Sequence, residues 1–226
     1  MTGRQWLIIV GPAAAGKSTF AAHLIARYPQ FVHASDLDAL KELFALEDGG
    51  LPSARYWPAA SRSEPGVRRT VSLPEGGHDI IDPTVWDQAL MAVVDRYRFH
   101  SYVALEFSRG ADQRYLSMHD IPLSEAYIPS FRLLHAELAS KPHTTLSIVH
   151  VSAPFALRCV RNRERQSRGG HYVSESVMRS TYAVDPLDSW LGTDPTWPSI
   201  DYFPIDGRHP LDAQCLTLFD RLTASR

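Results

Sequence analysis

Two kinds of hydrophobic pattern alternate along this chain. Short, mostly apolar runs are typical of strands that are buried on both faces of a parallel sheet. These runs lie at residues 6–10, 31–34, 102–107, 146–151 and 200–205. Between them, apolar residues recur every three or four positions, which is the spacing of a helix with one buried face. The alternation predicts an α/β fold with three α/β/α layers, in which a mainly parallel five-stranded sheet lies between helices.

Several predicted helices begin at residues that favour such a boundary. The helix after the first strand starts at Ser18, and Ser35 or Asp36 can cap the next helix. Asp82 and Pro83 form the start of a third helix, with Asp82 as N-cap and Pro83 as the first helical residue. Further helices are expected at about 127–138, from 154, at 174–182 and at 211–222.

The regular pattern is lost in one long segment. Residues 47–78 are rich in Gly, Pro, Ser and Arg and show no sustained periodicity. In a compact domain, so long a segment is usually a functional loop or lid. The length of 226 residues fits one domain, since domains average roughly 100–200 residues. We therefore expect a single domain over residues 1–226, with an insertion at about 47–78 that faces the site.

Composition limits the partners and the compartment. A formal net charge of −2 and a pI near 6.5 give no basic field of the kind that attracts nucleic acid, which is therefore a disfavoured partner. The apolar run near the start is too short for the core of a signal peptide, and no stretch is long enough to cross a bilayer. Two cysteines fit a reducing compartment. We expect a cytoplasmic protein without a membrane partner, and the oligomeric state stays open.

One motif indicates a specific chemistry. The segment GPAAAGKST, from Gly11 to Thr19, matches the phosphate-binding pattern G-x-x-x-x-G-K-[ST] between a predicted strand and a predicted helix. Glycines let the backbone curl around phosphate and point N–H groups at its oxygens, and the helix adds its dipole. Lys17 supplies a countercharge and Ser18 a hydroxyl for Mg²⁺. An incidental Gly-rich turn is the alternative. The predicted nucleotide contacts are Gly11, Ala14, Ala15, Gly16, Lys17, Ser18 and Thr19, and the predicted ligands are ATP, or GTP, with Mg²⁺.

A phosphate-binding loop (P-loop) alone does not separate switch GTPases, mechanical ATPases and small-molecule kinases. Four segments together cover under half of the chain: the loop itself, HASDLDAL, YVALEFSRG and VSAPFALRCVRNRERQSRGGHYVSESV. They resemble the P-loop kinases, a group that includes adenylate and gluconate kinases, polynucleotide 5'-kinases and chloramphenicol phosphotransferase. The resemblance implies the P-loop NTPase fold with an arginine-rich lid.

The segment HASDLDAL places two carboxylates after the second predicted strand. The resemblance implies that Asp36 is the catalytic base for an acceptor hydroxyl, and strand carboxyl ends converge where such a base must lie. If a helix begins at Asp36, the Asp38 side chain points about 200° away, so only one of the two should face the site. Asp38 is a secondary candidate for substrate binding, and helix capping is the alternative role of Asp36. The Asp-Asp-x-x-Arg pattern frequent in the group is absent, because Leu37 follows Asp36.

The segment YVALEFSRG is similar to a Walker B strand, which ends in an acidic residue. Glu106 is therefore a candidate to hold Mg²⁺ through a water, and a structural salt bridge is the alternative. Arg109, three residues later, is a candidate to contact substrate phosphate or to pair with Glu106.

Arginines gather in the fourth segment. At about 100° per residue, four of them lie within roughly 80° on one helix face, and Arg163 lies on the other side. The four are Arg158, Arg161, Arg165 and Arg168. The resemblance implies a lid at about 158–174, in which Arg161 and Arg165 neutralise charge on the transferring phosphoryl group and residues 169–170 form a hinge. A solvated basic face is the alternative.

The predicted insertion also contains candidates for acceptor binding. Arg55 and Trp57 offer a cation and a ring to an acceptor that has a ring or an anionic group. An ordinary surface loop is the alternative.

Together these patterns favour an ATP-dependent kinase that transfers the γ-phosphoryl group to a hydroxyl or phosphate of an unidentified small molecule. In this hypothesis Lys17 and the loop amides hold the β and γ phosphates, and Asp36 receives the acceptor proton. Two alternatives stay open: a regulatory ATPase without a small-molecule acceptor, and a polynucleotide 5'-kinase.

Overall fold

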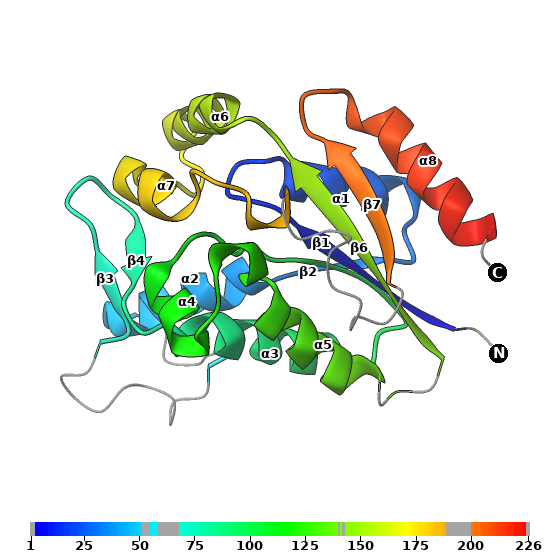
Figure 1. Ribbon diagram of the computed structural model, residues 1–226, viewed down its shortest axis with the longest axis horizontal. Helices are drawn as coiled ribbons and strands as arrows, with labels where there is room; N and C mark the ends of the chain where they lie inside the picture. The colour runs from blue at the N-terminus through cyan, green and yellow to red at the C-terminus, as the bar shows by residue number, and fades with distance from the viewer. Residues whose placement is uncertain are drawn as a thin grey trace.

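A parallel sheet of five strands runs through the centre of the protein (Figure 1). The structure, a computed structural model, describes residues 3–50, 55–57, 68–139, 141, 143–188 and 200–224. The strand order is β2-β5-β1-β6-β7, and every neighbouring pair is parallel. The strands are β1 (Arg4–Val10), β2 (Val32–Ser35), β5 (Tyr102–Glu106), β6 (Thr144–Ser152) and β7 (Asp201–Asp206). The five predicted strands are confirmed, with their ends shifted by at most two residues.

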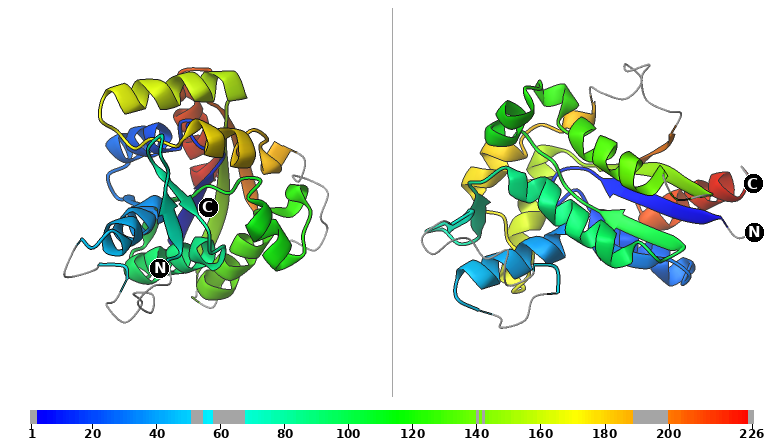
Figure 2. Two further views of the ribbon diagram at one scale, coloured as in Figure 1. Left: turned by 90° about the vertical axis from the view of Figure 1, so that its left-hand side faces the viewer. Right: turned by 90° about the horizontal axis from the view of Figure 1, so that it is seen from below.

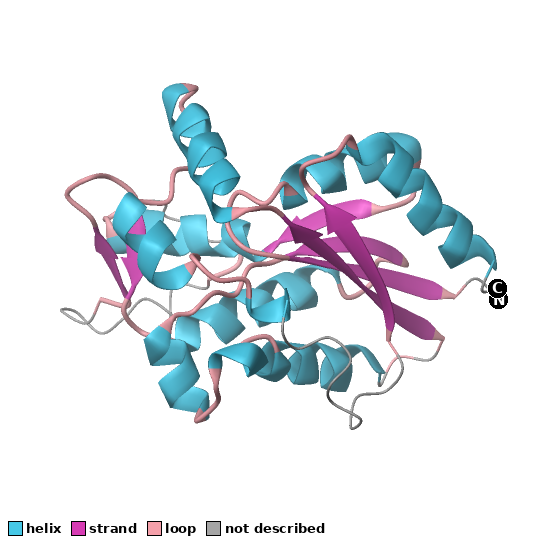
Figure 3. Cartoon of the chain, turned by 45° about the horizontal axis from the view of Figure 1, so that its top comes forward, coloured by secondary structure: helices cyan, strands magenta, loops and turns pink. Residues whose placement is uncertain are grey.

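Helices cover both faces of this sheet, as the hydrophobic pattern predicted (Figure 3). On one face, α1 (Lys17–Arg27) packs against α8 (Leu211–Ala224). The other face carries α2 (Asp36–Glu47), α3 (Thr84–Tyr97) and α5 (Ile128–Ala139). None of the helices in the described part of the chain is long and apolar enough to cross a membrane.

The central strand β1 supplies side chains to both cores. Trp6, Ile8 and Val10 belong to the core shared with α2, α3 and α5, whereas Leu7 and Ile9 belong to the core shared with α1 and α8. Successive side chains of a strand point to opposite faces, so a strand between two helix layers must be apolar at every position. This explains why the run has no polar alternation.

The link between β5 and α5 contains a helix that the pattern did not predict. It is α4 (Gln113–His119), which Asp112 caps by accepting a hydrogen bond from the Arg114 backbone N–H at 3.0 Å. Seven residues make only two turns, which is too short to show a hydrophobic period. After β6 come α6 (Phe155–Ser167) and α7 (Glu175–Thr181), close to the predicted positions.

The end of the predicted insertion forms a β-hairpin with the residues that follow it, which the sequence pattern did not predict. Strand β3 (Thr70–Ser72) pairs antiparallel with β4 (His78–Ile80). The Glu47 carboxylate anchors the hairpin to the end of α2, because it accepts hydrogen bonds from the backbone N–H groups of Arg69 and Thr70. Three-residue strands are too short to show an alternating pattern. Residues 51–54 and 58–67 of the insertion lie outside the described residues.

The start of α3 differs from the prediction by one residue. Pro83 is the N-cap and the helix begins at Thr84. Asp82 keeps its capping role, since its Oδ1 accepts a hydrogen bond from the Thr84 backbone N–H at 3.0 Å.

Candidate functional site

The P-loop lies between β1 and α1, the context that the motif predicted. Gly11 and Gly16 have φ angles of 138° and 116°, which residues with a side chain rarely adopt. A Cβ atom at Gly11 would also lie 2.1 Å from the carbonyl oxygen of Val151. The loop therefore requires glycine at its first position both for conformation and for space.

Lys17 is the first residue of α1, and its ammonium lies inside the loop. The side chain is buried, and Nζ donates to the carbonyl oxygens of Gly11 and Pro12 at 3.0 Å each. Burial lowers the pKa of Lys17, although the nearby carboxylates of Glu106 and Asp36 oppose the change. Backbone carbonyl groups of the loop thus surround the Lys17 ammonium, and the carboxylates of Glu106 and Asp36 lie nearby.

Ser18 and Glu106 form a polar pair beside the loop. The Ser18 hydroxyl donates to Glu106 Oε1 at 2.9 Å. Parallel register sets Glu106, the last residue of β5, opposite Ile9 of β1 and Ser35 of β2. Burial would raise the pKa of Glu106, but the neighbouring His33 and Lys17 outweigh burial and hold it below its ordinary value. Glu106 is therefore an ionised carboxylate at the carboxyl edge of the sheet.

This pair fits the metal that the motif predicted. Glu106 Oε2 is buried and makes no hydrogen bond within the described residues, and the Nε2 atom of His33 is 3.6 Å away. An ionised oxygen without a hydrogen-bond partner among the described residues, next to a serine hydroxyl, is a suitable donor set for Mg²⁺ when phosphate oxygens and water complete the coordination. The residues present thus fit a Mg²⁺-bound nucleoside triphosphate.

Asp36 lies on the same edge, one strand further out. It is the first residue of α2 and is 4% exposed. Ser35 caps this helix by accepting a hydrogen bond from the Leu37 N–H, so the alternative reading of Asp36 as the cap is wrong. Asp38 is exposed on the other side of the helix, in agreement with the predicted separation of the two carboxylates.

A buried arginine holds the Asp36 carboxylate in place. Arg109 Nη1 donates to Asp36 Oδ2 at 3.1 Å, and both side chains are buried. Burial raises the pKa of Asp36 to about 6, although the charge of Arg109 opposes the change. Asp36 is therefore ionised at neutral pH and is a stronger base than an ordinary aspartate.

The surroundings of Arg109 correct its expected role. Its Nε atom donates to Ser130 Oγ at 3.0 Å, and Nη2 donates to the Trp86 carbonyl at 3.0 Å. The predicted pairing of Arg109 with Glu106 was wrong, because the guanidinium donates to Asp36 instead. The predicted contact of Arg109 with substrate has no support, because the side chain is only 2% exposed. Sequence reasoning missed the pair because 73 residues separate its members.

The four arginines on one face of α6 have three different environments. Arg158 is buried and donates to the carbonyls of Ala153 and Tyr182, so it fixes the helix to α7. Arg161 donates to the Ala15 carbonyl at 3.1 Å and to the Gly207 carbonyl at 2.6 Å, which places it against the P-loop. These contacts of Arg158 and Arg161 contradict the alternative interpretation that the arginines form a solvated basic face.

The other two arginines of that face line the cavity described below. Arg165 is half-buried, its Nη2 donates to Asn162, and its buried Nε has no hydrogen-bond partner among the described residues. Burial lowers the pKa of Arg165, and the Glu106 carboxylate opposes the change. Arg168 is exposed at the end of α6. Arg163, on the opposite face, pairs with Glu175 at 3.0 Å.

The predicted hinge forms the end of α6. Gly169 has a φ of 74°, and a Cβ atom at Gly170 would lie 2.7 Å from Cγ of Arg165. Glycines at these positions let the chain turn tightly behind Arg165. Their use as a hinge stays a prediction.

Arg55 and Trp57 do not line the cavity, which corrects their expected role in acceptor binding. Trp57 is buried in the core beside α2, where its Nε1 atom donates to the Ala39 carbonyl. Arg55 Nη2 donates to the Tyr97 hydroxyl at 3.2 Å. Glu42 holds this segment to α2 by accepting the backbone N–H groups of Tyr56 and Trp57. These side chains stabilise the attachment of the segment.

One cavity of about 920 Å³ brings the remaining candidates together. The P-loop, Asp36, Glu106, Arg161 and Arg165 all line it. Seen from the hairpin side, α6 and α7 lie above the strand ends, and the hairpin stands in front of them (Figure 2, left). Sequence reasoning missed the walls that come from the hairpin, from the end of α7 and from residues 207–212, since none of these carries a recognisable motif.

The chain thus has an α/β fold with a five-stranded parallel sheet, flanking helices and the P-loop pattern between β1 and α1. No protein-family model matches the chain, and no curated protein matches its sequence. Among solved structures, a proposed kinase from Chloroflexus aurantiacus aligns over 100% of both chains, with a TM-score of 0.55 and 15% identity.

Two further structures align with lower scores. A gluconokinase from Sinorhizobium meliloti matches with a TM-score of 0.49 and 13% identity, over 99% of this chain and 95% of that chain. The APS kinase of Mycobacterium tuberculosis, solved in complex with AMPPNP and APS, matches with a TM-score of 0.47 and 11% identity, over 99% of each chain. At these identities the similarity shows the fold alone.

Proposed function

We propose that this protein is an ATP-dependent kinase that transfers the γ-phosphoryl group to a small-molecule acceptor with the help of Mg²⁺. The observation that carries the proposal is the position of Asp36, a buried carboxylate on the same cavity as the P-loop. A nucleotide-driven switch or motor has no need of a second carboxylate held by a buried arginine at this place. A kinase needs a group there that accepts the proton of the incoming hydroxyl.

The nucleotide would be bound by the P-loop. Lys17 and the backbone N–H groups from Ala14 to Thr19 hold the β and γ phosphates, and Lys17 exchanges its carbonyl partners for phosphate oxygens. Ser18 and Glu106 hold the Mg²⁺, which neutralises phosphate charge when bound. These groups are preorganised, because backbone geometry and parallel register fix them.

Asp36 and the lid would complete the chemistry. Asp36 orients the acceptor hydroxyl and takes its proton, and Arg109 fixes the carboxylate from behind. Arg165 has an unused buried N–H to offer to the transferring group, whereas Arg161 braces the P-loop at Ala15. The domain would thus comprise a rigid sheet edge and a lid on α6 that covers it.

The test is the substitution Asp36→Asn. It should lower phosphoryl transfer by about 10²–10⁴-fold, the usual contribution of a general base, and leave ATP affinity nearly unchanged. Transfer is measured as the mass gain of one phosphoryl group on an acceptor, and affinity by calorimetry with AMPPNP and Mg²⁺. Asp38→Asn is the matched control and should keep full activity, because Asp38 is exposed on the other side of α2. Nucleotide hydrolysis that needs no acceptor and persists in Asp36→Asn would instead support a regulatory ATPase.

A further inference from the structure

The cavity has a second end, which is lined by residues from outside the P-loop. It is built by α2, α3, the loop after β5 and the end of α7, close to Asp36. We call it the aromatic end and define it by Leu37, Leu40, Phe44, Trp86, Phe107 and Tyr182. Phe44 also stacks on the ring of His78 from the hairpin, with a centroid distance of 4.3 Å and an angle of 2° between the rings. Flat apolar surfaces of this kind favour a ligand with a flat apolar body.

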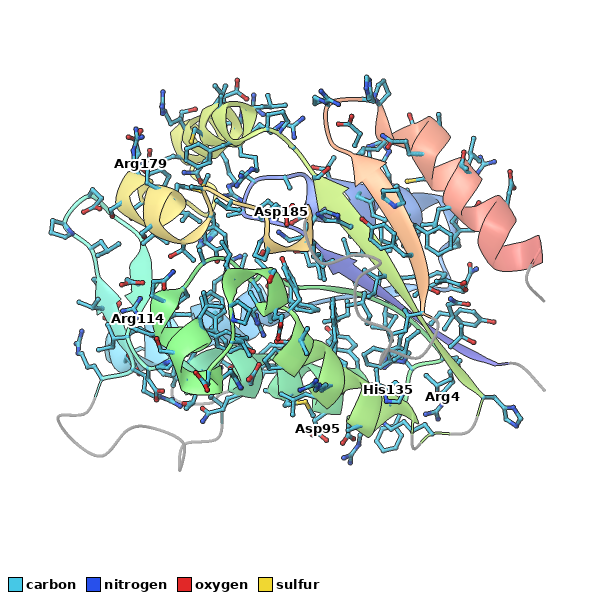
Figure 4. The ribbon with its side chains drawn as sticks, viewed as in Figure 1. Arg4, Asp95, Arg114, His135, Arg179 and Asp185 are labelled. Carbon is cyan, nitrogen blue, oxygen red and sulfur yellow. The ribbon has the colours of Figure 1, made fainter. Side chains whose placement is uncertain are left out.

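The charges around this end are already paired. Arg109 is committed to Asp36, and Arg114 donates to Asp79 at 2.9 Å and to Asp112 at 3.3 Å. Figure 4 shows Arg114 on α4 beside the hairpin that carries Asp79. Arg109 Nη2 also lies 3.6 Å from Asp87 Oδ1. Two guanidinium groups therefore face four carboxylates, and the balance of these charges is negative.

Two further arginines of the cavity, Arg161 and Arg165, interact with its nucleotide side. Arg161 bonds the P-loop carbonyl of Ala15, and Arg165 lies near enough to Glu106 and Lys17 to interact with their charges. His171, which also lines the cavity, is neutral at pH 7, because burial lowers its pKa to about 4. An anionic group at the aromatic end would have to displace a carboxylate from Arg109 or Arg114, and it would face the repulsion of the carboxylate it displaced.

We infer that the acceptor is an alcohol with a flat, largely apolar body and no anionic group, which enters the aromatic end with its hydroxyl toward Asp36. The inference rests on the proposed kinase function and narrows its acceptor from a hydroxyl or phosphate to a hydroxyl. In the reaction, the acceptor oxygen forms a bond to the γ-phosphorus, and the bond from that phosphorus to the β,γ-bridging oxygen breaks. ADP leaves with the bond electrons, and the hydroxyl proton passes to the Asp36 carboxylate.

The test compares neutral alcohols with matched anions. Suitable pairs are 4-nitrophenyl glucoside with 4-nitrophenyl glucuronide, thymidine with thymidine 5'-phosphate, and benzyl alcohol with 4-(hydroxymethyl)benzoate. Binding is measured with Mg²⁺ and AMPPNP present, and transfer by mass gain with Mg²⁺ and ATP. At least one neutral member should bind and gain one phosphoryl group, with kcat/KM about tenfold or more above that of its anionic partner, because like charges at a buried site repel strongly.

Two variants, each with a control, show whether the aromatic end decides the preference for the neutral acceptor. Asp79→Asn removes one of the two carboxylates that hold Arg114, so it should reduce the preference for the neutral member by several-fold. Asp95→Asn removes a carboxylate that pairs with Arg98 at the remote end of α3, and it should change nothing (Figure 4). Phe44→Ala should raise the KM for the neutral member by several-fold and spare ATP affinity, whereas Phe99→Ala, at a position 75% exposed, should not.

The results that overturn the inference differ from those that overturn the kinase proposal. Preference for the anionic member of each pair, or no binding of any neutral member, overturns the inference even when ATP binds normally. An equal effect of Asp79→Asn on both members of a pair also overturns it. No affinity for ATP with Mg²⁺, together with no transfer to either set, overturns the proposed function itself.

Discussion

The two ends of the cavity are built from different kinds of groups. At the P-loop end, one continuous segment from Gly11 to Thr19 supplies backbone N–H groups, one ammonium and one hydroxyl. At the aromatic end, side chains arrive from α2, α3, the loop after β5 and the end of α7. The first end offers a backbone geometry suited to a polyphosphate, which any sequence with the right glycines can reproduce. The second end offers side-chain shape and charge, which change freely with sequence.

The largest effect expected at the P-loop end comes from Lys17→Met. The variant should lose about 10²–10³-fold in kcat and also bind ATP more weakly, because it removes the only cation enclosed by the loop in the described structure. Calorimetry with AMPPNP and Mg²⁺ measures affinity, and mass gain of an acceptor measures turnover.

If the neutral acceptor binds to Lys17→Met with its normal affinity, the two ends of the cavity act independently in binding. Simultaneous loss of acceptor affinity would show that the two ends do not act independently.

Arg109→Gln should have the next largest effect, and this effect is on stability. The substitution leaves the buried Asp36 without its charge partner, which typically costs about 3–5 kcal/mol in the free energy of unfolding. Denaturant unfolding followed by circular dichroism measures the change.

The double variant Arg109→Gln with Asp36→Asn is the matched control for this prediction. It should recover part of the lost stability, because no buried charge is left unpaired. A double variant no more stable than Arg109→Gln would show that the loss comes from the missing bonds to Ser130 and Trp86 and not from an unpaired Asp36.

Arg165→Ala should lower kcat by about 10²-fold, as expected for one donor to the developing charge, with a small change in ATP affinity. Steady-state kinetics with saturating ATP measures the effect. Arg163→Ala is its control on the opposite face of α6, where the arginine is exposed and pairs with Glu175. Equal losses in the two variants would mean that α6 contributes only through its overall charge.

The pH dependence gives the smallest effect and concerns Asp36 alone. Because its pKa is raised to about 6, kcat/KM should fall about tenfold per pH unit below that value. Initial rates from pH 5 to pH 8 measure this fall in kcat/KM, after correction for the ionisation of ATP itself.

The raised pKa of Asp36 affects stability in the direction opposite to its effect on kcat/KM. The folded protein binds this proton more tightly than the unfolded chain, so the contribution of Asp36 to the free energy of unfolding falls as the pH rises from 3.8 to about 6. This slope should disappear in Asp36→Asn. A slope that is the same in the variant would assign it to another group.

The sequence was informative wherever an interaction is local. The P-loop pattern and the five apolar runs predicted the fold class, because glycine conformation and hydrophobic periodicity act within a few neighbouring residues. The capping residue Ser35 and the opposite directions of Asp36 and Asp38 were also predictable, since both follow from the geometry of one helix turn.

The candidates that failed depended on distant partners. Arg109 was expected to meet Glu106 or substrate, but packing between β5, α2 and α3 directs it to Asp36. Arg158 shares a helix face with Arg165, yet α7 covers only Arg158 and leaves Arg165 on the cavity. Trp57 was expected at the site and is buried beside Ala39 instead. Helical phase gives the direction of a side chain and says nothing of what packs against it.

By itself, the sequence determined the phosphate-binding loop, the alternation of strands and helices and the position of Asp36 at a strand end. Only the tertiary structure decided which arginine holds Asp36, which arginines line the cavity and which rings line its second end. The reason is that backbone preferences act over a few residues, whereas charge pairing and cavity shape depend on side chains brought together from across the chain.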